Sequence, residues 1–369
     1  MPYATPTGSV YDSGEFERLM TECMALSDWR GYVAREKQSK QAGKIRGRSV
    51  SSYIEHAGIF NETMNIRFDA GGTVTIVAGT HSHGQGHATA FAQLVGEWLG
   101  VPFESIRYLQ GDTDKVPFGR GTYAARSATL GGSALKLASE AIIEKGCAMA
   151  AHVLEAAAND IEFSGGEYRV RGTDKTLSMI ETAKWFYHPV LPIDVPLGLE
   201  ASGTFNGNVP SYPNGCHVVE VEVDPATGET KIDRYTVVDD CGRAINPMIC
   251  EGQIHGGLAQ GIGQALMENV VYDRDSGQLL TGSYMDYAMP RADDMGTLTT
   301  AFSDVPCKTN PIGIKGVGES GAIGAPPAVM NAVADALRSI GVDHIDMPAT
   351  PFHVWEAINA VTQRDDARP

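Results

Sequence analysis

Three glycine-rich segments that carry little charge constrain the fold of this 369-residue chain most strongly. They lie at residues 79–87, 119–127 and 315–321, and each precedes a stretch with helical character. Free N–H groups at a helix start favour anions such as phosphate, and glycine lets a ligand approach the backbone closely. Together the segments suggest a site for a phosphorylated, polar, planar cofactor, and ordinary tight turns with left-handed glycines are the competing interpretation.

The three segments do not match the common nucleotide-binding motifs. None has the Walker pattern, and none places GxGxxG between a strand and a helix with an acidic residue about 20 positions later. The sequence therefore gives little support to a P-loop, Rossmann or kinase site.

Helical and strand patterns are mixed along the chain. Alternating apolar residues around a turn predict β-hairpins at residues 62–78 and 219–235. Apolar residues at helical spacing predict helices at residues 14–40, 91–99, 131–159, 252–267 and 328–340. Because these elements follow no strict βαβ order, the sequence predicts an α+β fold of mixed β-sheets with packed helices. The polar stretch 186–215 is a possible weak subdivision.

Composition excludes several classes of protein. Lys and Arg number 29 against 45 Asp and Glu, which gives a net charge of −16 with no basic run, so no nucleic-acid partner is expected. The absence of an apolar leader and of about 18 consecutive apolar residues predicts a cytoplasmic protein without a membrane span. Six scattered cysteines without CxxC spacing predict that any iron–sulfur cluster lies on another chain.

Three histidines in the first glycine-rich segment raise a competing hypothesis. His81, His83 and His87 could ligate zinc, as in a metal-dependent hydrolase. Their spacing is not that of HExxH, and residues 81 and 83 share a face only in an extended chain. We therefore expect no metal site here and assign His81 and His83 to the loop surface or to loop hydrogen bonds.

Glu319 is the candidate catalytic residue. It stands alone among small residues in GVGESGAIGAPP, where a carboxylate has little structural use. Glycine backbone and a buried cofactor around it would raise its pKa by desolvation, as a general base requires. The alternative is that Glu319 complements the N-terminus of a helix beginning near Pro327.

Four segments, in order along the chain, resemble cofactor loops of the molybdenum hydroxylase family, which includes xanthine dehydrogenase and aldehyde oxidase. The segments are GTHSHGQGHATAFAQ at 79–93, GTYAARSATLGGSA at 121–134, DDCGRAINP with EGQIHGGLAQGIGQAL across 239–266, and KGVGESG at 315–321. The pair GQGH and GTYAARS is most similar to the bacterial branch that contains carbon monoxide dehydrogenase large chains. The resemblance implies the C-terminal half of the molybdopterin-binding catalytic region.

The resemblance also implies roles for individual residues. Glu319 matches the glutamate that accepts a proton during hydroxylation. Other positions match residues that bind molybdopterin cytosine dinucleotide carrying molybdenum: Gln85, Gly86, His87, Arg126, Ser127, Gln253 and Gly318. No protein ligand to the metal is expected. Residues 1–45 would be a lead-in helical segment that ends a preceding cofactor-binding domain, and residues 46–369 the molybdopterin-binding domain.

Family catalytic chains are considerably longer, and their N-terminal half has no counterpart in this sequence. The resemblance therefore implies three partners, namely that half of the large subunit, an iron–sulfur subunit and a flavin (FAD) subunit. The expected reaction is hydroxylation of an aldehyde or N-heterocycle with water as the oxygen source. A carbon monoxide dehydrogenase-type chain is the first alternative, and a non-catalytic pterin-binding or assembly fragment is the second.

Overall fold

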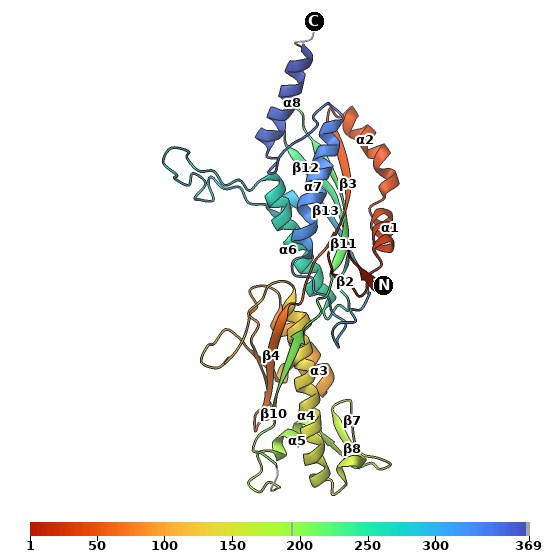
Figure 1. Cartoon of the computed structure of the whole chain (residues 1–369), viewed down its shortest axis with the longest axis vertical. Coiled ribbons are helices and arrows are strands. Elements are labelled where there is room, and N and C mark those ends of the chain that lie inside the picture. The colour runs from red at the N-terminus through yellow and green to blue at the C-terminus, as the bar shows by residue number, and fades with distance from the viewer. Residues whose placement is uncertain (193–194, 367–369) are drawn as a thin grey trace.

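The computed structural model describes residues 1–192 and 195–366, so positions 193 and 194 of the stretch 186–215 and the last three residues of the predicted domain lie outside the described residues. Figure 1 shows an elongated molecule whose two layered lobes follow one another along the long axis. Sheets and helices are mixed in both lobes, which confirms the predicted α+β class. Within the described ranges, no helix combines the length and apolar character needed to cross a membrane.

The helices are α1 Phe16–Leu26, α2 Tyr32–Gln41, α3 His87–Leu99, α4 Gly132–Val153, α5 Met179–Trp185, α6 Pro247–Leu266, α7 Ser320–Arg338 and α8 Pro351–Asp366. The strands are β1 Tyr3–Ala4, β2 Val10–Tyr11, β3 Ile45–Ile54, β4 Phe60–Phe68, β5 Val74–Ala78, β6 Ile106–Leu109, β7 Ile161–Ser164, β8 Glu167–Val170, β9 Thr176–Ser178, β10 Glu200–Gly207, β11 Asn214–Val223, β12 Thr230–Asp240 and β13 Thr297–Phe302. A π-helical turn, Ser127–Gly131, leads directly into α4.

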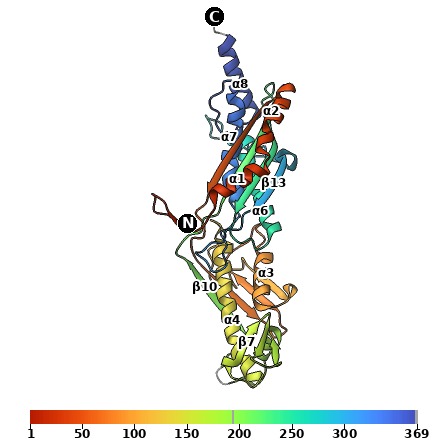
Figure 2. The same cartoon turned by 90° about the vertical axis from the view of Figure 1, so that its right-hand side faces the viewer.

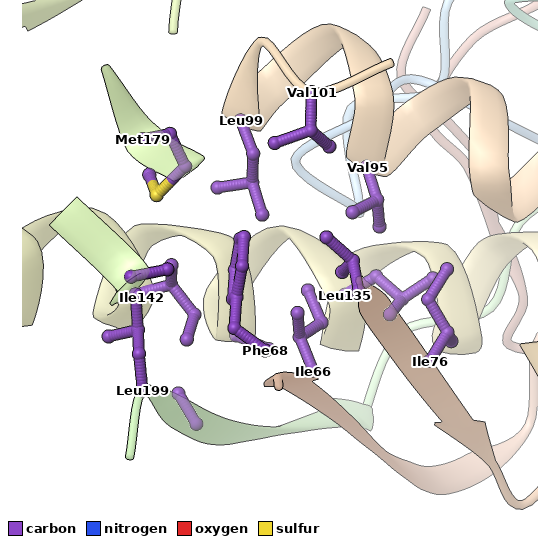
Figure 3. Close-up of a cluster of buried hydrophobic side chains, with 14 of the residues drawn as sticks. Ile66, Phe68, Ile76, Val95, Leu99, Val101, Leu135, Ile142, Met179 and Leu199 are labelled. Carbon is purple, nitrogen blue, oxygen red and sulfur yellow. The ribbon is translucent and has the colours of Figure 1, made fainter. Parts of the chain in front are cut away.

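The first lobe contains the sheet β10-β4-β5-β6, with α3 and α4 packed on one face. Strand β4 alternates between buried and more exposed positions, as expected of an antiparallel strand with one covered face. Figure 3 shows Ile66 and Phe68 of β4 pointing toward Leu135 and Ile142 of α4, with α3 closing the cluster from above. A small sheet, β7-β8-β9, and α5 lie at the far end of this lobe (Figure 1).

The second lobe contains the sheet β13-β12-β11-β3, which has helices on both faces (Figure 2). Side chains of β11 alternate between the two faces, so Val219 and Val221 pack with α6 and α7, whereas Cys216 and Val218 pack with α1. The N-terminal segment, including α1, therefore packs against strands that follow the first lobe in sequence. The second lobe is formed by residues 1–54 and 214–366, on either side of the first.

Both predicted hairpins are confirmed, as β4–β5 and β11–β12. The helix at 91–99 is also confirmed, as part of α3, which ends at the left-handed Gly100. The predicted helix 14–40 is wrong as one element, because Asp28 adopts a left-handed φ of 53° and its side chain accepts a hydrogen bond from the Gly31 N–H, which separates α1 from α2.

Two further helix boundaries differ from the prediction. The helix predicted at 131–159 stops at Val153, because Glu155 adopts a left-handed φ of 51° and strand β7 begins soon afterwards. The helix predicted from residue 328 begins at Ser320 and continues through Pro326 and Pro327, while α8 follows it and was not predicted. Where α7 continues through these two prolines, it packs closely on α6.

Candidate functional site

A cavity of about 300 Å³ lies where loops of the two lobes meet. Every loop identified by its glycine content contributes to its wall. The lining includes His83, Gln85, His87, Thr122, Tyr123, Ala125, Ser127, Cys241, Arg243, Asn246, Cys250, Gln253, Gly316, Gly318 and Glu319. The structure therefore brings five of the seven predicted cofactor-binding residues together with Glu319, and Gly86 lies in the chain between two of those five.

Three helical N-termini point their first turns at this cavity. Helix α3 begins at His87, the π-turn that continues into α4 begins at Ser127, and α7 begins directly after Glu319. None of the three N-cap residues makes a side-chain capping hydrogen bond. The first N–H groups and the positive ends of three helix dipoles are therefore directed at one site, an arrangement that favours a bound anion.

The first residue of α3, His87, presents a buried imidazole to the cavity. The His87 ring is 6% exposed and packs on Phe91, with 5.4 Å between ring centroids, and its Nδ1 has no hydrogen-bond partner. Burial lowers the pKa of His87 to about 4, and the neighbouring His83 and His81 add to the effect. His87 is therefore neutral near pH 7, with one ring nitrogen left for a ligand.

Two glycines leave the backbone of the loop before α3 accessible to a ligand. Gly84 and Gly86 have φ angles of 127° and 73°, in the region that favours glycine, and a Cβ on Gly84 would meet nothing within 4 Å. The Gln253 amide of α6 donates to the Gly84 carbonyl at 3.3 Å, and Gln85 Oε1 accepts from the His83 N–H at 2.8 Å. The two glutamines thus shape the loop from opposite lobes.

Glu319 lines the cavity and is exposed to solvent. Its carboxylate accepts a hydrogen bond from the Ala125 N–H at 2.9 Å, across the boundary between the lobes. The helix predicted to begin near Pro327 begins instead at Ser320, so Glu319 lies directly at its N-terminus. Glu319 occupies the N-cap position of that helix without a capping bond and is exposed rather than buried by the protein.

The loop 119–127 contains a feature that composition did not indicate. Ala124 and Ala125 have φ angles of 48° and 47°, a left-handed conformation that L-alanine seldom adopts. This conformation directs the Ala125 N–H toward Glu319. In the same loop, Thr122 Oγ1 and Ser127 Oγ are hydrogen-bonded at 2.7 Å.

Arg126 differs from its expected role. Its side chain is fully buried, pairs with the equally buried Glu62 at 2.6 Å and also donates to the carbonyls of Asn61 and Gly121. It is absent from the cavity lining described above. The guanidinium lies behind the wall and holds the loop 119–127 on β4, so a direct cofactor contact does not fit this geometry.

A buried ion pair supports the loop that carries Glu319. Lys315 Nζ and Asp240 Oδ2 are 2.5 Å apart with both side chains fully buried, and Ser211 Oγ donates to the Lys315 carbonyl at 3.1 Å. Burial raises the pKa of Asp240, and the Lys315 charge opposes that shift. Sequence reasoning missed this pair, although two adjacent acids ending an apolar strand are a usable signal.

Other residues at the cavity were also missed. Cys241 and Cys250 line it side by side, and the contact with Cys250 together with burial raises the pKa of Cys241. Glu55 lies against Glu319 and is only 8% exposed. No local pattern in the sequence marks these residues, because each faces a partner that only the tertiary fold supplies.

In the described parts of the chain, the histidines of the loop 79–87 do not form a metal-binding group. His81 and His83 are stacked with 6.1 Å between ring centroids, whereas the His87 ring packs on α3. Among the described residues, no group of three or more His, Cys, Asp or Glu side chains is arranged to hold a metal ion.

The cavity combines three features: uncapped helix N-termini, glycine backbone that a ligand can approach, and neutral polar side chains. Together they suit a large anionic organic cofactor. The chain belongs to the molybdopterin cofactor-binding domain family, whose model matches residues 22–296. It is 36% identical to the nicotine 6-hydroxylase large subunit of Paenarthrobacter nicotinovorans over 98% of this chain and 46% of that protein. It is 35% identical to the carbon monoxide dehydrogenase large chain of Hydrogenophaga pseudoflava over 97% of this chain and 46% of that protein.

The fold is similar to a solved relative as well. Quinoline 2-oxidoreductase from Pseudomonas putida 86 superposes with a TM-score of 0.90 at 33% identity, over 100% of this chain and 48% of that chain. The chain thus spans about half the length of the relatives it matches. These similarities confirm the family that the glycine-rich loops resembled.

The residues present fit the cofactor of this family. The orphaned His87 Nδ1 is buried at the cavity, and a Cβ on Gly318 would have only Gln253 Oε1, at 3.9 Å, within 4 Å. Backbone at Gly318 is thus open to a ligand, as backbone at Gly84 is. An oxygen- and nitrogen-rich pterin with a phosphate requires such a set of polar groups and uncapped helix starts.

Proposed function

We propose that this chain is the cofactor-binding half of the catalytic subunit of a molybdenum-dependent oxidoreductase that hydroxylates a small organic molecule with oxygen from water. The observation that carries the proposal is a carboxylate, Glu319, in the wall of a cavity that three uncapped helix N-termini also border. An N-heterocycle is the favoured substrate class, because nicotine and quinoline, which two similar proteins are named for, are N-heterocycles. An aldehyde is the other member of the expected class.

Cofactor binding is assigned to residues on both lobes. His87, Gln85 and Gly86 would bind the pterin and its phosphate from the start of α3, and Ser127 would bind from the π-turn. Gln253 and Gly318 would contact the cofactor from the second lobe. Arg126 would act through the loop that it holds, as a positioning residue. When bound, the cofactor supplies a redox-active metal that accepts the electrons of the substrate.

Glu319 would accept the proton released during hydroxylation. The Ala125 N–H orients its carboxylate toward the cavity, and the adjoining glycines leave room for a substrate in contact with it. A positioned base of this kind typically contributes about 10²–10⁴-fold to a rate. The walls formed by both lobes would exclude water from one side of the reacting groups.

The cytosine dinucleotide form of the cofactor is part of the proposal. A second hollow of about 320 Å³ adjoins the first, and both are bordered by Arg243, Ile245 and Ile314. Lys136 and Arg243 line it and pair with Glu140 at 3.6 Å and Glu97 at 3.7 Å, and a second phosphate would bind these two cations in place of the carboxylates. Mild acid hydrolysis of the purified complex should release cytidine monophosphate, detectable by mass spectrometry, and release of another nucleotide would contradict this form.

The partners are also proposed. Since the chain spans about half of its relatives, the other half of the large subunit would complete the cavity wall. Iron–sulfur and flavin subunits would remove electrons. Six free cysteines suit a reducing compartment, and the cytoplasm is therefore the proposed location of the complex.

Carbon monoxide oxidation is the second candidate, because a carbon monoxide dehydrogenase large chain is 35% identical. The test is to purify the complex that contains this chain, measure molybdenum by mass spectrometry, and supply N-heterocycles, aldehydes and carbon monoxide in isotopically labelled water. Label in a hydroxylated heterocycle supports the main proposal, and label only in carbon dioxide supports the second candidate. A fully loaded complex that converts none of these would indicate the non-catalytic alternative.

A further inference from the structure

Glu55 is a buried carboxyl group that the proposed reaction does not yet use. It follows β3 directly, and its N–H donates to the Pro213 carbonyl at 2.9 Å, which fixes its backbone beside the start of β11. The side chain is 8% exposed, and its buried Oε2 has no hydrogen-bond partner. A buried carboxylate normally requires a cation or several donors, and among the described residues no Lys, Arg or His forms an ion pair with Glu55.

The group that Glu55 faces is another carboxyl group. Its carboxyl group lies close to that of Glu319, which also accepts the Ala125 N–H. Two carboxylates in contact repel each other strongly, so such a pair shares one proton near neutral pH. The protein environment of the two groups decides which one holds it.

Glu55 is the better site for that proton. It is buried, whereas Glu319 is exposed and is stabilised as a carboxylate by a backbone donor. Burial, followed by the contact with Glu319, raises the pKa of Glu55 to about 8. Tyr53, at the end of β3, and Asp239, which accepts the Tyr53 hydroxyl at 2.9 Å, also lie nearby, and neither offers Glu55 a positive charge. The cation of the loop that carries Glu319, Lys315, is paired with Asp240.

We propose that Glu55 is a neutral carboxylic acid that donates its O–H to the Glu319 carboxylate and thereby keeps that carboxylate ionised and directed at the cavity. Glu55 is a positioning residue, since it acts through Glu319. The proposal rests on the proposed function in one respect, the identification of Glu319 as the proton acceptor. Above about pH 8, loss of the shared proton leaves two adjacent carboxylates, which disturbs the orientation of Glu319.

The first test uses the chain itself and requires no activity. Carbon-13 NMR of glutamate carboxyl groups is recorded against pH for the wild type, E55Q and E319Q. We expect one carboxyl to titrate near pH 8, to vanish in E55Q, and to move down by more than about one pH unit in E319Q, where a like charge is replaced by an amide donor. An unchanged titration in E319Q would mean that burial alone protonates Glu55, and would overturn the pair.

The second test uses the assembled complex and compares E55L with E55Q. Leucine fills the space without a donor and should lower kcat by at least about tenfold, whereas glutamine donates at every pH and should recover that loss while removing the alkaline limb of the pH profile. Equal losses in both variants, or a wild-type profile in E55L, would refute the positioning role. If E319Q retained full turnover, the proposed function would fail while the NMR titration of the pair stayed valid.

Discussion

Among single residues, two consecutive alanines at the cavity have a backbone conformation that L-residues rarely adopt. Ala124 and Ala125 both adopt left-handed φ angles, which cost about 1–3 kcal/mol each, and the conformation places one N–H on Glu319. Arg126 follows immediately, and its buried bonds to Glu62 and two carbonyls hold the loop in that conformation. The position of Glu319, the proposed proton acceptor, therefore depends on how this loop is held.

Replacing Glu319 by Gln in the assembled complex should reduce kcat by about 10²–10⁴-fold, because the amide keeps the shape but cannot accept a proton. Molybdenum content and the thermal unfolding midpoint should stay at wild-type values. Steady-state assays and metal analysis on the same sample measure both. Near wild-type turnover in a fully loaded E319Q complex would remove Glu319 from the mechanism.

Replacing Arg126 by Met should destabilise the chain by about 3–5 kcal/mol even without cofactor, because Glu62 would be left charged and buried. The matched control is R171M. Arg171 pairs with Glu162 at a similar distance, 2.7 Å, but with both side chains more than half exposed, so its loss should cost less than about 1 kcal/mol. Urea unfolding measures both variants, and equal effects would contradict the assigned role of Arg126.

Glu55 should also affect how stability depends on pH. Its pKa is about 8 in the folded chain against an ordinary value of 4.5, so the folded state holds the extra proton between these values and stability falls as pH rises through that window. The side-chain amide of the E55Q variant cannot titrate. The free energy of unfolding of E55Q minus that of the wild type should therefore increase from about pH 4.5 to 8, and a flat difference would contradict the raised pKa.

At the scale of elements, α6 and α7 pack so closely that some positions admit only glycine. A Cβ on Gly257 would lie 2.8 Å from the Ala322 backbone nitrogen, whereas a Cβ on the neighbouring Gly256 would meet nothing within 4 Å. This contact fixes the start of α7 and with it the position of Glu319. Substituting each of these two adjacent glycines by alanine therefore separates the effect of close packing, at Gly257, from that of helix propensity, at Gly256.

We expect G257A to destabilise the chain by about 1–3 kcal/mol through overpacking. G256A should instead stabilise it by about 0.5–1 kcal/mol, because alanine favours a helix more than glycine does at an exposed position. Chemical unfolding of the two variants is the measurement. A stabilised G257A variant would show that α6 and α7 can separate without cost.

The elements also show what a sequence can reveal. The hairpins and α3 were predictable because alternation and a terminal glycine are local signals. The break at Asp28 and the passage of α7 through Pro326 were not, since side-chain capping and interhelical packing decide them. At the site, Glu319 could be found from its isolation among glycines, whereas Glu55 and the buried state of Arg126 depend on partners distant in sequence.

At the scale of the whole molecule, an arm formed by residues 268–291 projects from the second lobe between α6 and β13 (Figure 1). Tyr284 and Met285 on this arm are 84% and 92% exposed, and Val270 and Leu280 are more than half exposed. Apolar side chains this exposed usually mark a contact with another polypeptide. The other half of the large subunit is the partner that the proposed function supplies.

The isolated chain should therefore self-associate and contain less than stoichiometric molybdenum. Light scattering after size-exclusion chromatography should show oligomers, and Y284K together with M285K should shift them toward monomer. Co-expression with the other half of a related large subunit should restore the metal. A monomeric, fully loaded and active single chain would contradict both expectations.

The path of the chain between the lobes has a mechanical consequence. The polypeptide enters the first lobe through residues 55–59 and returns through 208–213, and these connectors are joined by paired hydrogen bonds of 2.9 Å between Ala57 and Ser211. His87 and Glu319 thus lie on two lobes that are joined by these connectors and by a few hydrogen bonds at the cavity, such as those of Ala125 with Glu319 and of Gln253 with Gly84. A cofactor bound by residues of both lobes would add a further link between them, so its binding should reduce the motion of one lobe relative to the other. A protease should therefore cut the connectors more readily before the cofactor binds than after it.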